Sequence, residues 1–186
     1  MKYIKLFEEH SYSMYDLITM DESQLIELLI NEIDSKNPNL DLIRDILGYS
    51  VLDINSTIYE DWSALIYAVA NGNIQATEIL LEQPTINVNL QDGDGQTALM
   101  WAVQTGREDC LESLLNHPGI DVNVQTKDGW TALMFAARDR KEKSPELLLK
   151  HPGIDVDIKN GYGKTAWEYA SASIREQFPE LNPDFR

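Results

Sequence analysis

The apolar and polar positions along this chain form a pattern that returns every 34 residues. In each copy, a serine or threonine precedes a run of small and apolar residues with helical spacing, as in 97–105. These starting residues are Ser63, Thr97, Thr131 and Thr165. In three copies, a second apolar segment ends in paired leucines before a proline, which lacks the amide proton that would continue a helix. A repeat of this length predicts a stack of helix–turn–helix units.

Turn residues separate the predicted helices. Asp or Gly stands two residues before each starting residue, as in 95–97. Gly72 and Gly106 can supply the positive φ that commonly ends a helix. After the second helix the chain leaves in an extended piece, such as 86–89. The first helices are rich in alanine and the second helices are bulkier. The stack is therefore expected to curve, with the first helices and the turns on its concave side.

The first 57 residues follow the same pattern more weakly. Asp21 and Gln24 have the spacing of a capping box ahead of an apolar helix, and the second apolar segment is in phase with the later ones. We predict a degenerate first repeat over 21–57, with residues 1–20 as a lid on its exposed core face. The C-terminal tail from Phe178 is too short for a full second helix and is predicted to cap the last unit.

The repeated motifs resemble the ankyrin repeat family. The matching features are Asp-x-x-Gly-x-Thr-x-Leu at 92–99, the alanine pair at 136–137, Gly106, the leucine pair at 114–115 and Asp-Val-Asn at 121–123. The resemblance covers about residues 50–172 and implies an all-α ankyrin-repeat solenoid of helix–turn–helix units with short β-hairpin-like turns. We expect the N-terminal cap and degenerate first repeat over 1–57. Ankyrin repeats are expected over 58–186, divided at 58–91, 92–125, 126–159 and a truncated, capped 160–186.

The chain also departs from the family pattern. Alanine stands where the family usually has proline, as at Ala98, and Met100 and Met134 replace the usual histidine. Histidine-mediated hydrogen bonds between repeats are therefore not expected. Near 140 the usual glycine is missing. We expect the second helix of that repeat to start late, with Ser144 as its cap and Pro145 at its first position.

Charge narrows the class of partner. The net charge is −16, and residues 1–125 hold 5 basic and 21 acidic residues, whereas residues 126–186 hold 10 of each. Phosphate repels such a surface, so nucleic acid and anionic membranes are not expected as partners. The acidic excess either keeps the chain in solution or steers it toward a basic protein surface.

Other features bear on the compartment. No apolar run is long enough to span a bilayer, and the first residues lack a signal-peptide pattern. The single cysteine, Cys110, allows no disulfide within the chain and is expected to be buried in a helix. These features predict a cytoplasmic protein, or one secreted into a host cytoplasm without a cleaved signal peptide.

The sequence contains no residue set with catalytic or metal-binding spacing. His117 and His151 occupy equivalent joints but lack further ligands, and 92–95 lacks the later acid of a calcium loop. We therefore predict no enzyme activity, no cofactor and no metal. A hydrolase or transferase that uses acids of residues 1–57 is the least favoured alternative, because no nucleophile–base pair is visible.

Two aromatic series are candidates for binding. The series in the first helices is more typical of packing between repeats: Tyr67, Trp101, Phe135 and Tyr169. The other series is Trp62 and Trp130, which precede the starting residues; an exposed tryptophan there is typical of an interaction hot spot, but it can also pack on a neighbouring turn. The resemblance places this position on the concave face or its rim. The predicted protein-binding set is Tyr59, Glu60, Trp62, Asp94, Gln96, Trp101, Gln104, Lys127, Asp128, Trp130, Arg138 and Tyr162.

Asn123 and Asn89 resemble the positions that asparagine hydroxylases modify in ankyrin repeats. The alternative is a structural role, in which the side-chain amide binds the backbone of the turn.

The favoured function is a monomeric protein-interaction module that binds a protein partner, with a basic surface, through the concave face and turn tips. The alternative is an inhibitor or immunity-type protein whose acidic N-terminal repeats block a basic enzyme surface. The chain is also similar to solo ankyrin chains of intracellular bacteria that act on host proteins.

Overall fold

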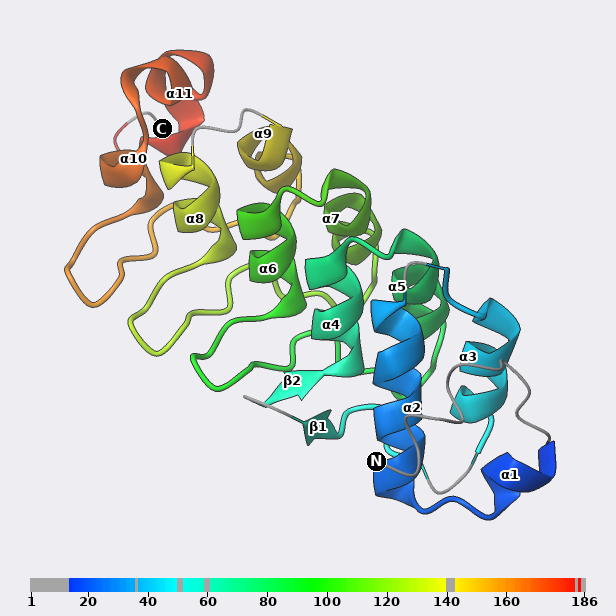
Figure 1. The fold of residues 1–186 in the computed structure, drawn as a ribbon. Coiled ribbons are helices and arrows are strands. Elements are labelled where there is room, and N and C mark those ends of the chain that lie inside the picture. Colours follow the sequence, from blue (N-terminus) through cyan, green and yellow to red (C-terminus); the bar gives the residue numbers. More distant parts are fainter. Residues whose placement is uncertain are drawn as a thin grey trace.

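The computed structural model describes residues 14–35, 37–49, 52–58, 61–139, 143–182 and 184. Its helices stack in two layers along one axis (Figure 1). The inner helices are α2 (Glu22–Asp34), α4 (Ala64–Asn71), α6 (Ala98–Thr105), α8 (Ala132–Arg138) and α10 (Ala166–Tyr169). The outer helices are α3 (Leu40–Leu47), α5 (Ile74–Leu81), α7 (Glu108–Leu115), α9 (Lys143–Leu149) and α11 (Ala172–Gln177). This arrangement confirms the predicted all-α solenoid.

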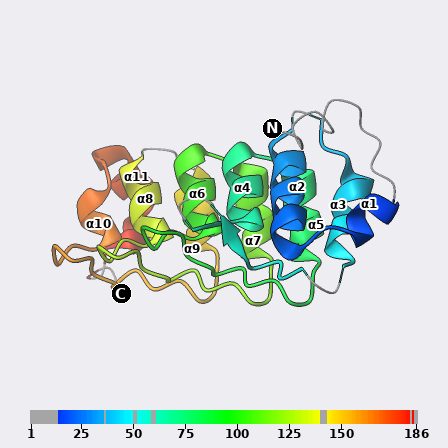
Figure 2. The same ribbon diagram turned by 60° about the horizontal axis from the view of Figure 1, so that its bottom comes forward.

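Each inner helix packs on the next, and the loops project to one side of the stack. Contacts join α2 to α4, α4 to α6, α6 to α8 and α8 to α10, and the outer helices from α3 to α9 form a parallel series. Figure 2 shows the inner helices side by side, with the connecting loops running beneath them. We call the long loops that precede α4, α6, α8 and α10 the fingers. Among the described residues, no helix combines the length and the apolar character needed to cross a lipid bilayer.

The helix signals in the sequence act as predicted. The hydroxyl oxygens of Ser63, Thr97 and Thr131 accept hydrogen bonds from the backbone N–H three residues later, at 3.3, 3.4 and 3.3 Å. At Thr165, the backbone N–H instead donates to the Glu168 carboxylate at 2.5 Å, and this bond lowers the pKa of Glu168. The helices α4 and α6 end at glycines with φ of 74° and 70°.

The backbone pairs with itself within a finger, and neighbouring fingers approach closely. In the first, β1 (Thr57–Ile58) pairs antiparallel with β2 (Trp62–Ser63), and a bridge between Gln91 and Thr97 repeats this pairing in the second. A residue with positive φ closes each finger: Asp61, Gly95, Gly129 and Gly163. A Cβ at Gly129 would lie 2.9 Å from the backbone of the following finger. Only glycine therefore permits this close approach.

A ladder of asparagine amides joins the extended segments that follow the outer helices. In each case the side-chain N–H donates to a carbonyl of the next unit, and the side-chain oxygen accepts from a backbone N–H there. Asn55 donates to the Thr85 carbonyl and accepts from the Asn87 N–H, at 2.9 and 2.7 Å. The corresponding pairs of distances are 2.8 and 2.8 Å for Asn89, and 2.7 and 2.9 Å for Asn123. We call this the asparagine ladder.

Both ends of the stack carry additional elements. Residues 1–13, most of the predicted N-terminal lid, lie outside the described residues; α1 (Met14–Ile18) buries Leu17 against the core. At the other end, η2 (Pro179–Leu181) follows α11, and Phe178 and Leu181 are buried. The division of the chain into individual repeats stays a prediction.

The prediction that Ser144 caps the second helix near residue 140, with Pro145 at its first position, is wrong. The helix α9 begins at Lys143, so Ser144 lies within its first turn and is only 2% exposed instead of capping the helix. Ser144 is one repeat beyond Cys110, which is buried as predicted, so this position needs a small side chain inside the packing. The Lys143 ammonium lies 2.9 Å from Glu108 and 3.3 Å from Glu112 of α7, and their hydrogen bonds raise its pKa.

A pair of glycine substitutions tests the contact between fingers. Gly163→Ala carries only the penalty of positive φ, since no atom lies within 4 Å of the added Cβ. We expect it to lower the free energy of unfolding by about 1 kcal/mol. Gly129→Ala must also displace backbone, so we expect a loss of about 3 kcal/mol. Urea denaturation measures both values, and equal losses would show that the close approach has no energetic weight.

A second test addresses the asparagine ladder. Asn89→Ala and Asn123→Ala each remove two hydrogen bonds between units, and we expect each to lower the free energy of unfolding by about 1–3 kcal/mol. The matched control is Asn116→Ala, because Asn116 is exposed at the end of α7 and lies outside the ladder. If the ladder variants unfold at the same urea concentration as the control, the ladder does not hold the units together.

Candidate functional site

The described members of the predicted binding set lie on the fingers and the inner helices. Tyr59 and Glu60 are outside the described residues. Three members belong to inner helices: Trp101, Gln104 and Arg138. The remaining members belong to the fingers: Trp62, Asp94, Gln96, Lys127, Asp128, Trp130 and Tyr162. We call the surface formed by the fingers and the exposed sides of the inner helices the inner face.

Trp62 lies in a cluster that spans two units. Its ring centroid is 5.0 Å from that of Tyr67 in the same unit and 4.6 Å from that of Trp101 in the next. The indole N–H of Trp101 donates to the Asp92 carboxylate at 2.8 Å. We call Trp62, Tyr67 and Trp101 the first aromatic cluster.

An equivalent cluster forms around Trp130. The Trp130 ring stacks on Phe135 at 5.0 Å and lies 4.4 Å from Tyr169 of the next unit. The Arg138 guanidinium lies over both Trp130 and Phe135, at 5.0 and 5.2 Å from the ring centroids. The Tyr169 hydroxyl accepts a hydrogen bond from the Asn160 amide at 2.7 Å. We call Trp130, Phe135 and Tyr169 the second aromatic cluster.

These contacts bear on the two alternatives for Trp62 and Trp130, an exposed side chain or one packed on a neighbouring element. Both side chains are half-buried, because each reaches from the end of a finger onto the aromatic residue of the next inner helix. The structure therefore combines the two aromatic series that the sequence analysis treated separately. The signal was present in the sequence, since Trp62 precedes Trp101 by the same interval that separates Trp130 from Tyr169.

The residue at the start of each of the last three fingers suits the hydrogen-bonding capacity of the aromatic side chain on the inner helix that follows. Where the helix carries Trp101, the finger supplies the Asp92 carboxylate as an acceptor for the indole N–H. Where the helix carries Tyr169, the finger supplies the Asn160 amide as a donor to the hydroxyl. Phe135 has no polar atom, and the equivalent finger position is Thr126, whose hydroxyl accepts from the backbone N–H of Trp130 at 3.0 Å.

Polar residues lie between the two clusters and at the tips of the fingers. Gln96 occupies the position that tryptophan holds in the fingers before and after it, and its amide oxygen accepts a hydrogen bond from Gln104. The Lys127 ammonium donates to the carbonyl of Gly93 on the preceding finger. Asp94 and Asp128 are exposed, and Tyr162 is 73% exposed in the last finger.

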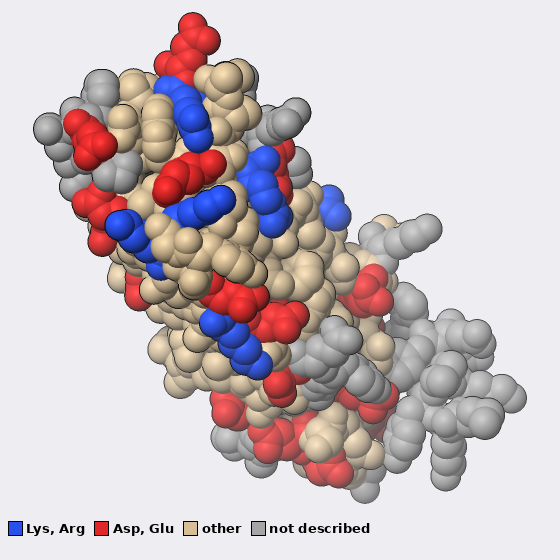
Figure 3. Space-filling model, turned by 90° about the vertical axis from the view of Figure 1, so that its left-hand side faces the viewer, with Lys and Arg blue, Asp and Glu red and all other residues tan. Residues whose placement is uncertain are grey.

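Charge changes along the stack. Arg44 is the one basic side chain among the described residues between 14 and 105, whereas Lys127, Arg138 and Lys164 belong to the later units. On the face drawn in Figure 3, basic side chains lie among acidic ones in the upper part, and only acidic ones appear in the lowest part of the described surface. The early units consequently present a more negative field than the late units.

The two candidate hydroxylation sites are members of the asparagine ladder. Both polar atoms of the Asn89 and Asn123 side chains take part in hydrogen bonds to the next unit. This geometry favours the structural role over an accessible amide. Hydroxylation at either residue stays a prediction.

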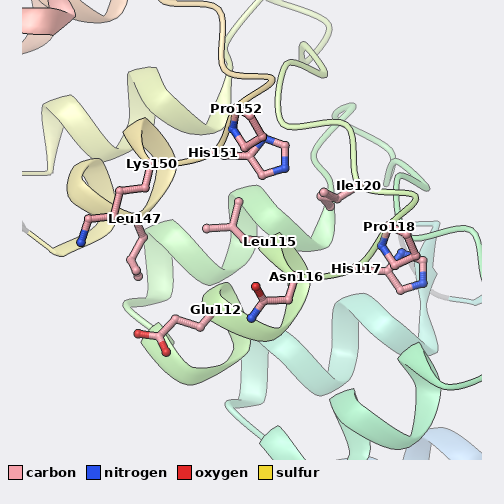
Figure 4. Close-up of a pocket in the computed structure, with 10 residues that line it drawn as sticks. All are labelled: Glu112, Leu115, Asn116, His117, Pro118, Ile120, Leu147, Lys150, His151 and Pro152. Atoms are coloured by element: carbon pink, nitrogen blue, oxygen red, sulfur yellow. The ribbon is translucent and has the colours of Figure 1, made fainter.

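A hollow that no sequence motif indicates lies on the side of the outer helices. It has a volume of about 670 Å³ and lies between the ends of α7 and α9 (Figure 4). His117 and His151 border it, but their Nδ1 atoms accept hydrogen bonds from the N–H of Gly119 and Gly153, at 3.1 and 3.2 Å. Within the described part of the chain, no group of three histidine, cysteine or acidic residues has the arrangement of a metal site.

Comparison with known proteins supports the fold. A sequence model of the ankyrin repeat, built from three copies, matches residues 23–126 and 119–178. These segments include all five inner helices apart from the first residue of α2. No curated protein matches the sequence.

Proposed function

The chain belongs to the ankyrin repeat family, whose repeats are generally protein-interaction modules and are typically not catalytic, and we propose that this member binds a protein partner through its inner face. The observation that carries the proposal is the pair of aromatic clusters on that face. In each cluster, the centroid of the tryptophan ring lies within 5.0 Å of two other aromatic ring centroids, one in its own unit and one in the next.

The packing of the clusters suits recognition. Tryptophan and tyrosine dominate interaction hot spots because they offer a large area with few rotatable bonds. Here the rings already contact one another and Trp101 is held by Asp92, so binding would order few side chains. Less conformational entropy is then lost on association.

The charge distribution supports an orientation for the partner. We place its basic region against the early, acidic units and its less basic region against the later units, where basic and acidic residues are balanced. The same surface disfavours nucleic acid and anionic membranes, because their phosphates would be repelled. The second candidate function, an inhibitor that blocks a basic enzyme surface, uses the same acidic units.

Removal of both tryptophans tests the proposal. We expect Trp62→Ala/Trp130→Ala to reduce recovery of the partner from a lysate by about tenfold or more, since hot-spot tryptophans each contribute about 2 kcal/mol or more. Mass spectrometry identifies the partner, and circular dichroism verifies that the variant is folded. The matched control is Trp167→Ala, because the Trp167 ring lies under Arg175 of α11, outside both clusters. Equal recovery by the folded double variant and the wild type would refute binding through the inner face.

Salt dependence tests the orienting role of charge. We expect the association rate constant for that partner to fall about tenfold between 50 and 500 mM salt, with a smaller change in the dissociation rate constant. Stopped-flow fluorescence measures both. An association rate constant that does not change with salt would contradict electrostatic steering. If the partner is an enzyme and stoichiometric addition of this chain stops its turnover, the inhibitor function replaces the simple binding module.

A further inference from the structure

The two aromatic clusters occupy equivalent positions, but the charge around them differs in sign. Trp62, Tyr67 and Trp101 each precede their counterparts Trp130, Phe135 and Tyr169 by two repeats. The segments that carry the first cluster, 58–71 and 91–101, contain four acidic residues and no basic one. The equivalent segments of the second cluster, 126–139 and 159–169, contain four basic residues and three acidic ones. The partner groups that suit the two clusters therefore differ in charge.

Arg138 is held on the rings of the second cluster and keeps unused hydrogen-bond donors. Its guanidinium lies 5.0 Å from the Trp130 centroid and 5.2 Å from the Phe135 centroid, distances typical of cation–π attraction. Its Nε donates to the Asp139 carboxylate at 3.0 Å, whereas its two terminal amino groups have no hydrogen-bond partner among the described residues. The side chain is 47% exposed. A carboxylate from outside the chain can therefore reach these amino groups.

A second cation, Lys164, lies on the same cluster. It holds the finger position that tryptophan holds in two earlier fingers. Its ammonium lies 5.6 Å from the centroid of the Tyr169 ring, which Trp130 contacts at 4.4 Å. Lys164 is exposed and forms no ion pair within the described part of the chain. The second cluster thus carries a guanidinium and an ammonium on rings that contact one another.

The acidic residues of these segments leave both cations with free donors. Asp139 binds only the Nε of Arg138. The Glu168 carboxylate accepts hydrogen bonds from the N–H and the hydroxyl of Thr165, at 2.5 and 3.0 Å. Asp128 is exposed and forms no ion pair with a described residue. Because neither cation is fully paired, an anion from outside the chain gains new hydrogen bonds here.

We propose that the second aromatic cluster binds a carboxylate side chain, of aspartate or glutamate, from the partner protein, with Arg138 and Lys164 as its contacts. This inference rests on the proposed function, because it names a residue class that the inner face recognises. Hydrogen bonds between a guanidinium and a carboxylate are about twice as strong as neutral ones. The rings already hold the guanidinium, so little side-chain entropy is lost on binding. The first cluster does not bind an acid, since Ala70 and Gln96 stand at the equivalent positions.

The test uses a fluorescently labelled peptide of four Glu-Gly repeats and a matched peptide of four Gln-Gly repeats. Fluorescence anisotropy measures the dissociation constant of each, in about 150 mM salt, where long-range repulsion is screened. We expect the glutamate peptide to bind at least about tenfold more tightly than the glutamine peptide. The net charge of −16 would by itself produce the opposite order. No binding of the glutamate peptide, or no preference for it, would overturn the proposal.

Charge-removing variants separate the cluster from the general field. We expect Arg138→Gln and Lys164→Gln each to weaken binding of the glutamate peptide about fivefold. The matched control is Lys150→Gln, which removes the same charge from an exposed side chain directly after the outer helix α9, and we expect a change of less than about twofold. Equal losses in all three variants would show that net charge attracts the peptide, and the proposal would be wrong.

Lys164→Gln also covers the case in which Arg138→Gln does not fold, because Lys164 is exposed. A Lys164→Gln chain that binds the glutamate peptide as tightly as the wild type would overturn the proposal, which requires both cations. Indole N–H resonances in NMR spectra locate the peptide: we expect the Trp130 resonance to shift on titration and the Trp62 resonance to stay unchanged. A shift at Trp62 alone would contradict the assignment to the second cluster. If the glutamate peptide fails in these measurements while partner recovery still depends on Trp62 and Trp130, the interaction function stands and only the carboxylate preference is refuted.

Discussion

The bonding of each unit to the next is the interaction on which the rest of the structure depends. Among the described residues, the buried apolar side chains form one continuous core, because each helix pair buries its apolar face against its neighbours. The asparagine ladder fixes the register of this stacking, because both polar atoms of each amide are bound in the following unit. The same register brings Trp62 onto Trp101 and Trp130 onto Tyr169. The aromatic clusters are thus a consequence of the interval between repeats.

Much of the fold could be predicted from the sequence because its signals are local. The starting hydroxyls of Ser63, Thr97 and Thr131 cap their helices, and Gly72 and Gly106 end helices with positive φ, as their residue types predict. The start of α9 could not be predicted in this way. Ser144 has the properties of a cap, but packing between outer helices takes precedence and buries it at the position of Cys110.

The candidate site was predicted less completely, because it depends on contacts between units. The sequence placed Trp62 and Trp130 on the fingers, but their burial is decided by the aromatic residue of the following helix. The position of the Arg138 guanidinium over two rings depends on the packing of the finger against α8 and has no signal in the sequence. The two clusters differ at equivalent positions two repeats apart, and a single motif read alone does not show this difference.

Side-chain footprinting of the complex would test the central claim most directly. Hydroxyl-radical oxidation, followed by mass spectrometry, measures the accessibility of individual side chains in the free chain and in the chain bound to its partner. Binding through the inner face predicts that oxidation of Trp62, Trp101 and Trp130 falls on binding, while residues of the outer helices α5 and α7 are unchanged. Protection of α5 and α7 with no change at these tryptophans would contradict the account.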